Sequence, residues 1–87
     1  MANILIVDDN AINVAMEEQL LKDTKLQIDV ARSGPECLKQ TKQRYYHVIL
    51  MDYQMSEMTG AEVLKELRKQ ENGLCRDSYV LLMTAAS

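Results

Sequence analysis

The chain has 87 residues, a length that fits one domain with a modest core. Ten basic residues against 13 acidic ones give a net charge of −3, and the chain carries no cluster of Lys and Arg of the kind that binds phosphate backbones. We therefore expect no direct binding of nucleic acid. No apolar run approaches the ~20 residues that a membrane-spanning helix needs, so we expect a cytoplasmic protein without membrane association.

Four short apolar runs divide the chain, at residues 4–7, 28–31, 48–51 and 79–83. The first, third and fourth are almost continuously apolar, which is typical of central strands in a parallel sheet that helices cover on both faces. After the first run, Ile12, Met16 and Leu20 fall four residues apart. This spacing predicts a helix that begins near Ala11 and packs this stripe on the sheet, with Glu17 on the solvent side.

Two further helices are indicated between the later strands. Ser33 and Glu36 match a helix N-cap and its capping box, and they predict a helix through about Gln43. In the last helical stretch, Val63, Leu64 and Leu67 form an apolar stripe. We expect that helix to end at Asn72-Gly73, because Gly can adopt the left-handed conformation that closes a helix.

The resulting order β-α-β-α-β-α-β predicts the α/β class, with a doubly wound parallel sheet and helices on both faces. Residues 1–87 would form one domain. Because the sequence stops shortly after the fourth strand, we expect a domain that is truncated there. Its fourth strand would then lie at an edge of the sheet, where unpaired backbone favours association into a homodimer.

Acidic side chains stand where two of these strands end. Asp8 and Asp9 follow the first strand, and Asp52 follows the third. If those strands are neighbours, three carboxylates meet at one edge of the sheet, and their repulsion suggests a bound divalent cation. Oxygen ligands favour Mg²⁺, and Thr84, after the fourth strand, would place a hydroxyl near a phosphoryl group held there.

Simpler interpretations exist for each of these residues. Asp8-Asp9-Asn10 is a plausible turn whose side chains cap the next helix. Asp52 alone would equally suit a loop cap, and a threonine at a strand end is common. The joint placement of these residues at three strand ends favours the site.

The same residues resemble the receiver domain of two-component response regulators. The resemblance is carried by residues 4–10, 48–55, Gly60 and 81–85, which follow each other in the family's order. Residues 8–13 resemble the corresponding segment in the receiver domains of hybrid sensor kinases. The resemblance implies a flavodoxin-like fold that here lacks its last strand and helices.

The resemblance also implies a function. Asp52 would accept a phosphoryl group from phosphohistidine on a sensor histidine kinase or a histidine phosphotransfer domain, which docks at the head of the first helix. Asp8, Asp9, Asp52 and the backbone carbonyl of Gln54 would bind Mg²⁺. Thr84 would turn toward the phosphoryl group, and the small Ala85 would leave room for it. Such a chain is a signalling module and not an enzyme.

Two departures from the family pattern stand out. Ser56 replaces the usual proline, so we expect a more mobile loop after Asp52. The chain also ends before the family's phosphate-binding lysine, so we expect metal binding with poor phosphorylation. One alternative is an interaction module that is not phosphorylated. Another is a Mg²⁺-dependent phosphatase with an aspartate nucleophile, but Asn10 and Gln54 stand where its general acid is needed.

Overall fold

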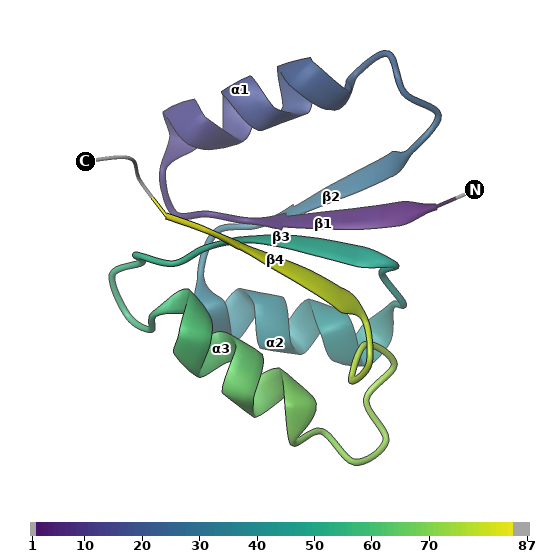
Figure 1. The fold of residues 1–87 in the computed structure, drawn as a ribbon, viewed down its shortest axis with the longest axis vertical. Helices are drawn as coiled ribbons and strands as arrows, with labels where there is room; N and C mark the ends of the chain where they lie inside the picture. Colours follow the sequence, from purple (N-terminus) through teal and green to yellow (C-terminus); the bar gives the residue numbers. More distant parts are fainter. Residues whose placement is uncertain (1, 85–87) are drawn as a thin grey trace.

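The computed structural model describes residues 2–84. Strands and helices alternate along the chain as the sequence predicts (Figure 1). Their bounds are β1 Asn3–Val7, α1 Ala11–Leu21, β2 Gln27–Ala31, α2 Gly34–Gln43, β3 Val48–Asp52, α3 Gly60–Arg68 and β4 Tyr79–Met83.

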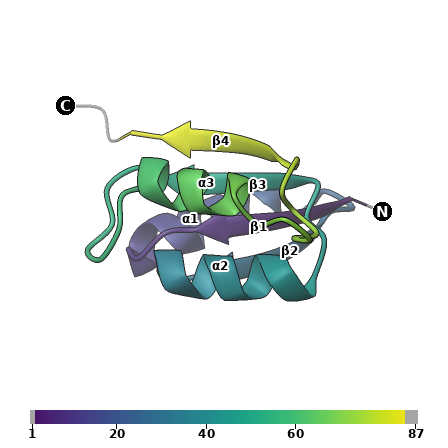
Figure 2. The ribbon, with the colours of Figure 1, turned by 90° about the horizontal axis from the view of Figure 1, so that it is seen from below.

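The strands form one parallel sheet in the order β2-β1-β3-β4. Helix α1 covers one face of the sheet, whereas α2 and α3 lie together on the other face (Figures 1 and 2). This arrangement confirms the doubly wound parallel sheet and the flavodoxin-like fold class. The chain leaves β1 toward one edge and returns to its other side as β3, so the strand order reverses between these two strands. In such sheets, ligands bind beyond the carboxyl ends of the strands at the point of reversal.

Side chains of the central strands alternate between two apolar cores. Leu5, Val7, Ile49 and Met51 are fully buried on the side of α2 and α3. Their alternating neighbours pack on the side of α1, where the residues are Ile4, Ile6, Val48 and Leu50. Because successive side chains of a strand point to opposite faces, Asp8 and Asp52 continue the rows on the α1 face.

Side-chain caps begin each helix where a strand or loop ends. The Ser33 hydroxyl accepts a hydrogen bond from the Glu36 amide at 3.1 Å, which confirms the predicted start of α2. Helix α3 begins with a full capping box, in which Thr59 and Glu62 accept each other's backbone N–H. These caps satisfy donors that the first helical turn cannot pair internally.

The predicted orientation of α1 is wrong. Ile12, Met16 and Leu20 are 71%, 58% and 80% exposed. The side that meets the sheet is formed instead by Val14, Glu17 and Leu21, spaced three and four residues apart. Apolar side chains occur on two sides of this helix, so their spacing alone does not decide which side packs on the sheet.

The predicted end of the last helix is also wrong. Helix α3 ends at Arg68, with Lys69 as its C-cap. The Lys69 amide donates to the carbonyls of Glu66 and Leu67, so a tight last turn closes the helix. Gly73 lies beyond it in a turn and is not in the left-handed region. The glycine therefore does not serve as the helix stop.

Polar and thiol groups complete the packing at the far end of the sheet. The Tyr46 hydroxyl donates to the carboxylate of Asp29 at 2.7 Å, and Arg44 lies 3.2 Å from the same oxygen. Cys37 and Cys75 are buried free thiols. Among residues 2–84, no helix is long and apolar enough to span a membrane.

Candidate functional site

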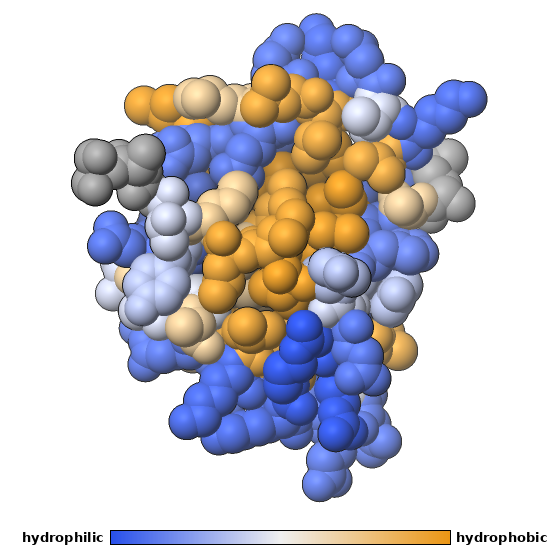
Figure 3. Space-filling view, in the orientation of Figure 1, coloured by the Kyte–Doolittle hydropathy of each residue, from blue (hydrophilic) through white to orange (hydrophobic). Residues whose placement is uncertain are grey.

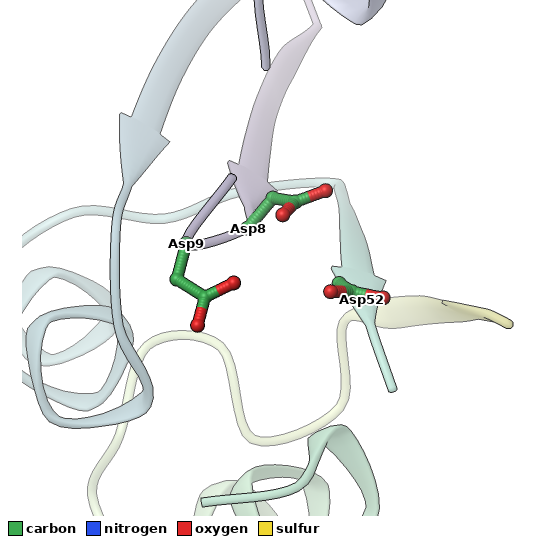
Figure 4. A group of neighbouring side chains, drawn as sticks. All are labelled: Asp8, Asp9 and Asp52. Carbon is green, nitrogen blue, oxygen red and sulfur yellow. The ribbon is translucent and has the colours of Figure 1, made fainter. Parts of the chain in front are cut away.

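Three carboxylates meet at the carboxyl ends of β1 and β3 (Figure 4). Asp8, Asp9 and Asp52 each offer one oxygen, and these oxygens all lie within 4.8 Å of one another. The convergence follows from the topology, because β1 and β3 are hydrogen-bonded neighbours whose ends lie level. The structure therefore brings together the three acidic residues that the sequence places at strand ends.

Backbone hydrogen bonds fix the acidic pair. Asp8 is only 2% exposed, and its side chain accepts the Asn10 amide at 2.9 Å. Asn10 in turn caps α1, accepting the amides of Ile12 and Asn13 at 2.9 and 3.0 Å. The helix-capping interpretation thus holds for Asn10, while both aspartates face Asp52.

A hydrogen bond connects the loop between β3 and α3 to Asp9. The backbone N–H of Ser56 donates to the Asp9 carboxylate at 2.9 Å, and the Arg32 guanidinium donates to the Asp9 carbonyl at 3.1 Å. Proline has no N–H and cannot make the first bond. Serine at position 56 therefore removes a restraint on φ but adds a charge-assisted hydrogen bond across the site.

The electrostatics of Asp52 reflect its neighbours. Burial raises the pKa of its carboxyl above the ordinary value, and the negative charges of Asp8 and Asp9 raise it further. Backbone N–H groups of Gln54 and Tyr53 partly oppose this rise in pKa. Ionisation of Asp52 is thus less favourable than ionisation of a free aspartate, and positive charge in the site would offset this effect.

The strand β4 and the start of α3 lie close to Asp52. Met83 is the register partner of Asp52, and its carbonyl accepts the Tyr53 amide at 2.8 Å. Thr84 follows directly and is exposed at the same edge, whereas Ala85 lies outside the described residues. A Cβ on Gly60 would meet the backbone oxygen of Asp52 at 2.6 Å, so only glycine allows α3 to begin this close.

Glu17 is a residue of this region that the sequence prediction assigned to solvent. It lies on the sheet-facing side of α1, and its Oε2 is buried without a hydrogen-bond partner among the described residues. Burial raises the pKa of this carboxyl, and the charges of Asp8 and Asp52 raise it further. The available signal was its spacing of three from Val14 and four from Leu21.

The donor set fits a hard divalent cation. All three side chains offer carboxylate oxygens, which Mg²⁺ prefers over nitrogen or sulfur ligands. The repulsion that raises the pKa of Asp52 would be relieved by a cation held among these oxygens. The chemistry of the site therefore matches a Mg²⁺ site that retains open positions for water or phosphate oxygens.

Comparison with known proteins gives a family match. The model of the response regulator receiver domain matches residues 4–87. The chain is 42% identical over 69 residues to the response regulator mcs4 of Schizosaccharomyces pombe, covering 79% of this chain and 13% of mcs4. It is 44% identical over 68 residues to hybrid signal transduction histidine kinase B of Dictyostelium discoideum, covering 78% of this chain and 4% of the kinase. The chain thus spans a small part of both relatives.

A solved structure has the same fold. The response regulator TrrA of Thermotoga maritima, in complex with Mg²⁺ and BeF, superposes with a TM-score of 0.87 at 32% identity. The match covers 100% of this chain and 72% of TrrA. TrrA has also been solved in complex with the histidine kinase ThkA, and that structure superposes with a TM-score of 0.85.

Proposed function

The chain belongs to the response regulator receiver domain family, and from this premise we propose that Asp52 accepts a phosphoryl group from a phosphohistidine. The donor is a sensor histidine kinase or a histidine phosphotransfer domain. One observation carries this proposal: the Asp52 carboxylate lies within 4.8 Å of two further carboxylates at the strand-order reversal. Family membership makes the chain a signalling module, and we infer that it performs no chemistry on other substrates.

In this mechanism Asp52 is the nucleophile. One carboxylate oxygen forms a bond to phosphorus as the bond from phosphorus to the histidine nitrogen breaks, so the phosphoryl group is transferred whole. Asp8, Asp9, Asp52 and the backbone carbonyl of Gln54 would hold Mg²⁺. The bound ion would offset negative charge on the carboxylates and on the phosphoryl oxygens. The Thr84 side chain then turns so that its hydroxyl donates a hydrogen bond to a phosphoryl oxygen. This movement of Thr84 changes the affinity of the domain for its partners.

We propose that the donor docks on the exposed side of α1. Most of the residues that line a shallow groove there are apolar, and the lining is formed by Ala11, Ile12, Ala15, Met16, Gln19 and Leu20. Figure 3 shows apolar side chains gathered along α1 and across the middle of the same face. Helix α1 begins next to the acidic residues, so a protein bound there would bring its phosphohistidine close to Asp52. The TrrA–ThkA complex supports a kinase as partner for this family.

Phosphorylation with a small-molecule donor tests the proposal directly. The wild-type chain and Asp52→Asn are each incubated with acetyl phosphate and Mg²⁺, and the intact mass is recorded. Asp23→Asn serves as the control, because it removes the same charge at an exposed position away from the site. We expect a phosphoryl adduct far below stoichiometric on the wild type and on Asp23→Asn, and none on Asp52→Asn or in samples without Mg²⁺; stoichiometric phosphorylation would contradict the expected poor transfer.

Other outcomes would select the alternatives. Mg²⁺ binding without any adduct would indicate an interaction module that is not phosphorylated. Release of inorganic phosphate from added phosphate esters, with many turnovers that depend on Asp52, would indicate a phosphatase. An adduct that persists in Asp52→Asn would show that another residue is the acceptor.

We also propose that β4 mediates association with a second copy of the chain. Among the described residues β4 pairs only with β3, and Tyr79, Leu81 and Leu82 are 73%, 49% and 38% exposed. An open strand edge with apolar side chains favours pairing between copies. Light scattering should give a dimer mass for the wild type and a smaller mass for Leu81→Lys, while Leu74→Lys, at a similarly exposed loop position, remains dimeric. A monomer mass for the wild type would refute the proposal.

A further inference from the structure

Glu17 places a fourth carboxylate on the face of the sheet that carries the acidic site. Its neighbours on the same side of α1, Val14 and Leu21, pack into the core that α1 forms with the sheet. Asp8 and Asp52 continue the strand rows on that same face. Helical side chains tilt toward the helix N-terminus, and the N-terminus of α1 is the end that adjoins Asp8. The general tilt of side chains on α1 is thus toward the end of the helix that adjoins the acidic site, and the charges of Asp8 and Asp52 act on Glu17.

One oxygen of this carboxylate is buried without local compensation. Its Oε2 is buried, and it has no hydrogen-bond partner in the part of the chain that the structure describes. A buried, unpaired carboxylate oxygen destabilises a fold, because its hydration is lost and not replaced. The negative charges of Asp8 and Asp52 add to this cost and raise the pKa of Glu17. The part of this cost that comes from charge repulsion falls when a cation enters the acidic site.

We propose that Glu17 strengthens Mg²⁺ binding at the Asp8–Asp9–Asp52 site as a remote charge that does not ligate the ion. The inference rests on the proposed Mg²⁺ site and adds Glu17 to the residues that set the affinity of that site for Mg²⁺. Repulsion among four carboxylates destabilises the metal-free protein, and the release of that repulsion adds to the binding free energy of the cation. Glu17 thereby makes the site more dependent on a divalent cation than the three aspartates alone would.

The expected size of the effect follows from Coulomb's law. A unit charge about 10 Å from a divalent ion, roughly the diameter of a helix, changes the affinity about four-fold in a water-like dielectric. Salt at about 0.1 M reduces this to about two-fold. The effect of Glu17 on the Kd for Mg²⁺ should therefore lie between these limits and shrink as salt is added.

The test compares Glu17→Gln with Glu18→Gln. The second variant removes the same charge from an exposed neighbouring position of the same helix. Mg²⁺ is titrated into each protein at low and at moderate salt, and amide shifts measured by NMR give the Kd. We expect Glu17→Gln to weaken binding two- to four-fold at low salt and Glu18→Gln to weaken it less. Glu17→Met repeats the test with an apolar side chain if the glutamine variant folds poorly.

Thermal stability supplies a second measurement, in which the dependence on Mg²⁺ separates an effect on the metal site from a purely structural role. In metal-free buffer Glu17→Gln should melt at a higher temperature than the wild type, and saturating Mg²⁺ should narrow the difference. Equal Kd values for wild type and Glu17→Gln at low salt would overturn this inference and leave the Mg²⁺ site intact. Absence of saturable Mg²⁺ binding by the wild type would overturn both.

Discussion

Replacement of Asp52 by asparagine should stabilise the metal-free protein while removing its response to Mg²⁺. The carboxylate oxygens of Asp8, Asp9 and Asp52 lie within 4.8 Å of one another, and burial together with the two neighbouring charges raises the pKa of Asp52. Asparagine has nearly the same shape and keeps one acceptor for the backbone N–H groups that face this position. The substitution therefore removes repulsion with little change in packing.

The distances set the magnitude. At the upper bound of 4.8 Å between these oxygens, two unit charges repel by about 0.9 kcal/mol in a medium like water and by about 3.5 kcal/mol at a dielectric constant of about 20. Asp52 is half-buried and faces two such neighbours. We take the water-like limit and discount it for screening at the surface, which leaves a stabilisation of about 1 kcal/mol. For a domain of this size, that corresponds to a rise in Tm of about 4–8 °C.

The stabilisation should depend on pH. Because the folded-state pKa of Asp52 is raised above its ordinary value of 3.8, the folded state binds this proton more tightly than the unfolded state. The stability linked to that proton is fully present below the unfolded pKa and is lost as pH rises through the folded pKa. The advantage of Asp52→Asn should therefore be largest at neutral pH and vanish in acid.

Differential scanning fluorimetry of both proteins, with chelator and with excess Mg²⁺, checks the prediction. Mg²⁺ should raise the Tm of the wild type and have a much smaller effect on Asp52→Asn. Asp23→Asn, at an exposed position, should behave like the wild type. An unchanged or lower Tm of metal-free Asp52→Asn would refute the reasoning, because repulsion at the site would then not destabilise the fold.

Three further predictions concern the packing. The Cys37 thiol, whose pKa burial raises to about 12, should resist alkylation at pH near 8 until denaturant is added; labelling at the rate of a free thiol would contradict its burial. Gly60→Ala should lower the free energy of unfolding by about 1–3 kcal/mol in urea titrations, since the new Cβ meets backbone at 2.6 Å. Gly73→Ala, which meets only a flexible glutamine side chain, should cost less. Tyr46→Phe should lower the free energy of unfolding by about 1 kcal/mol in the same titration, because the hydrogen bond to Asp29 is lost. An unchanged free energy of unfolding would show that water replaces this hydrogen bond without cost.

The sheet and the acidic cluster were predictable because both depend on pattern. Buried parallel strands are continuously apolar, and the residue that follows each strand lies at the same edge of the sheet. If β1 and β3 are neighbours, Asp8 and Asp52 must therefore lie close together, because each stands at the carboxyl end of its strand. The Ser33 cap was predictable for a similar reason, since its hydrogen bond is local in sequence.

Features that depend on tertiary geometry were not predictable. The side of α1 that packs on the sheet depends on where the helix crosses the strands. The sequence pattern therefore places Ile12 in the core and Glu17 in solvent, whereas in the structure Ile12 is exposed and Glu17 is half-buried on the sheet-facing side. The end of α3 is set by hydrogen bonds in its last turn, which the glycine pattern does not reveal. The bond from Ser56 to Asp9 joins residues 47 positions apart and leaves no local signal.

The strand order also determines how the domain can assemble during translation. β2 pairs with β1, β3 pairs with the free side of β1, and β4 pairs with β3, so every strand docks on one that was synthesised before it. Chains emerge from the ribosome at about 5–20 residues per second. The strand with which each new strand pairs has therefore already been synthesised, and its edge is free for pairing. Among the strands of residues 2–84, none after the first has to wait for a later segment, which shortens the time that apolar edges spend unpaired. Assembly in the order of synthesis would thus protect this parallel sheet from the slow pairing and aggregation to which such topologies are prone.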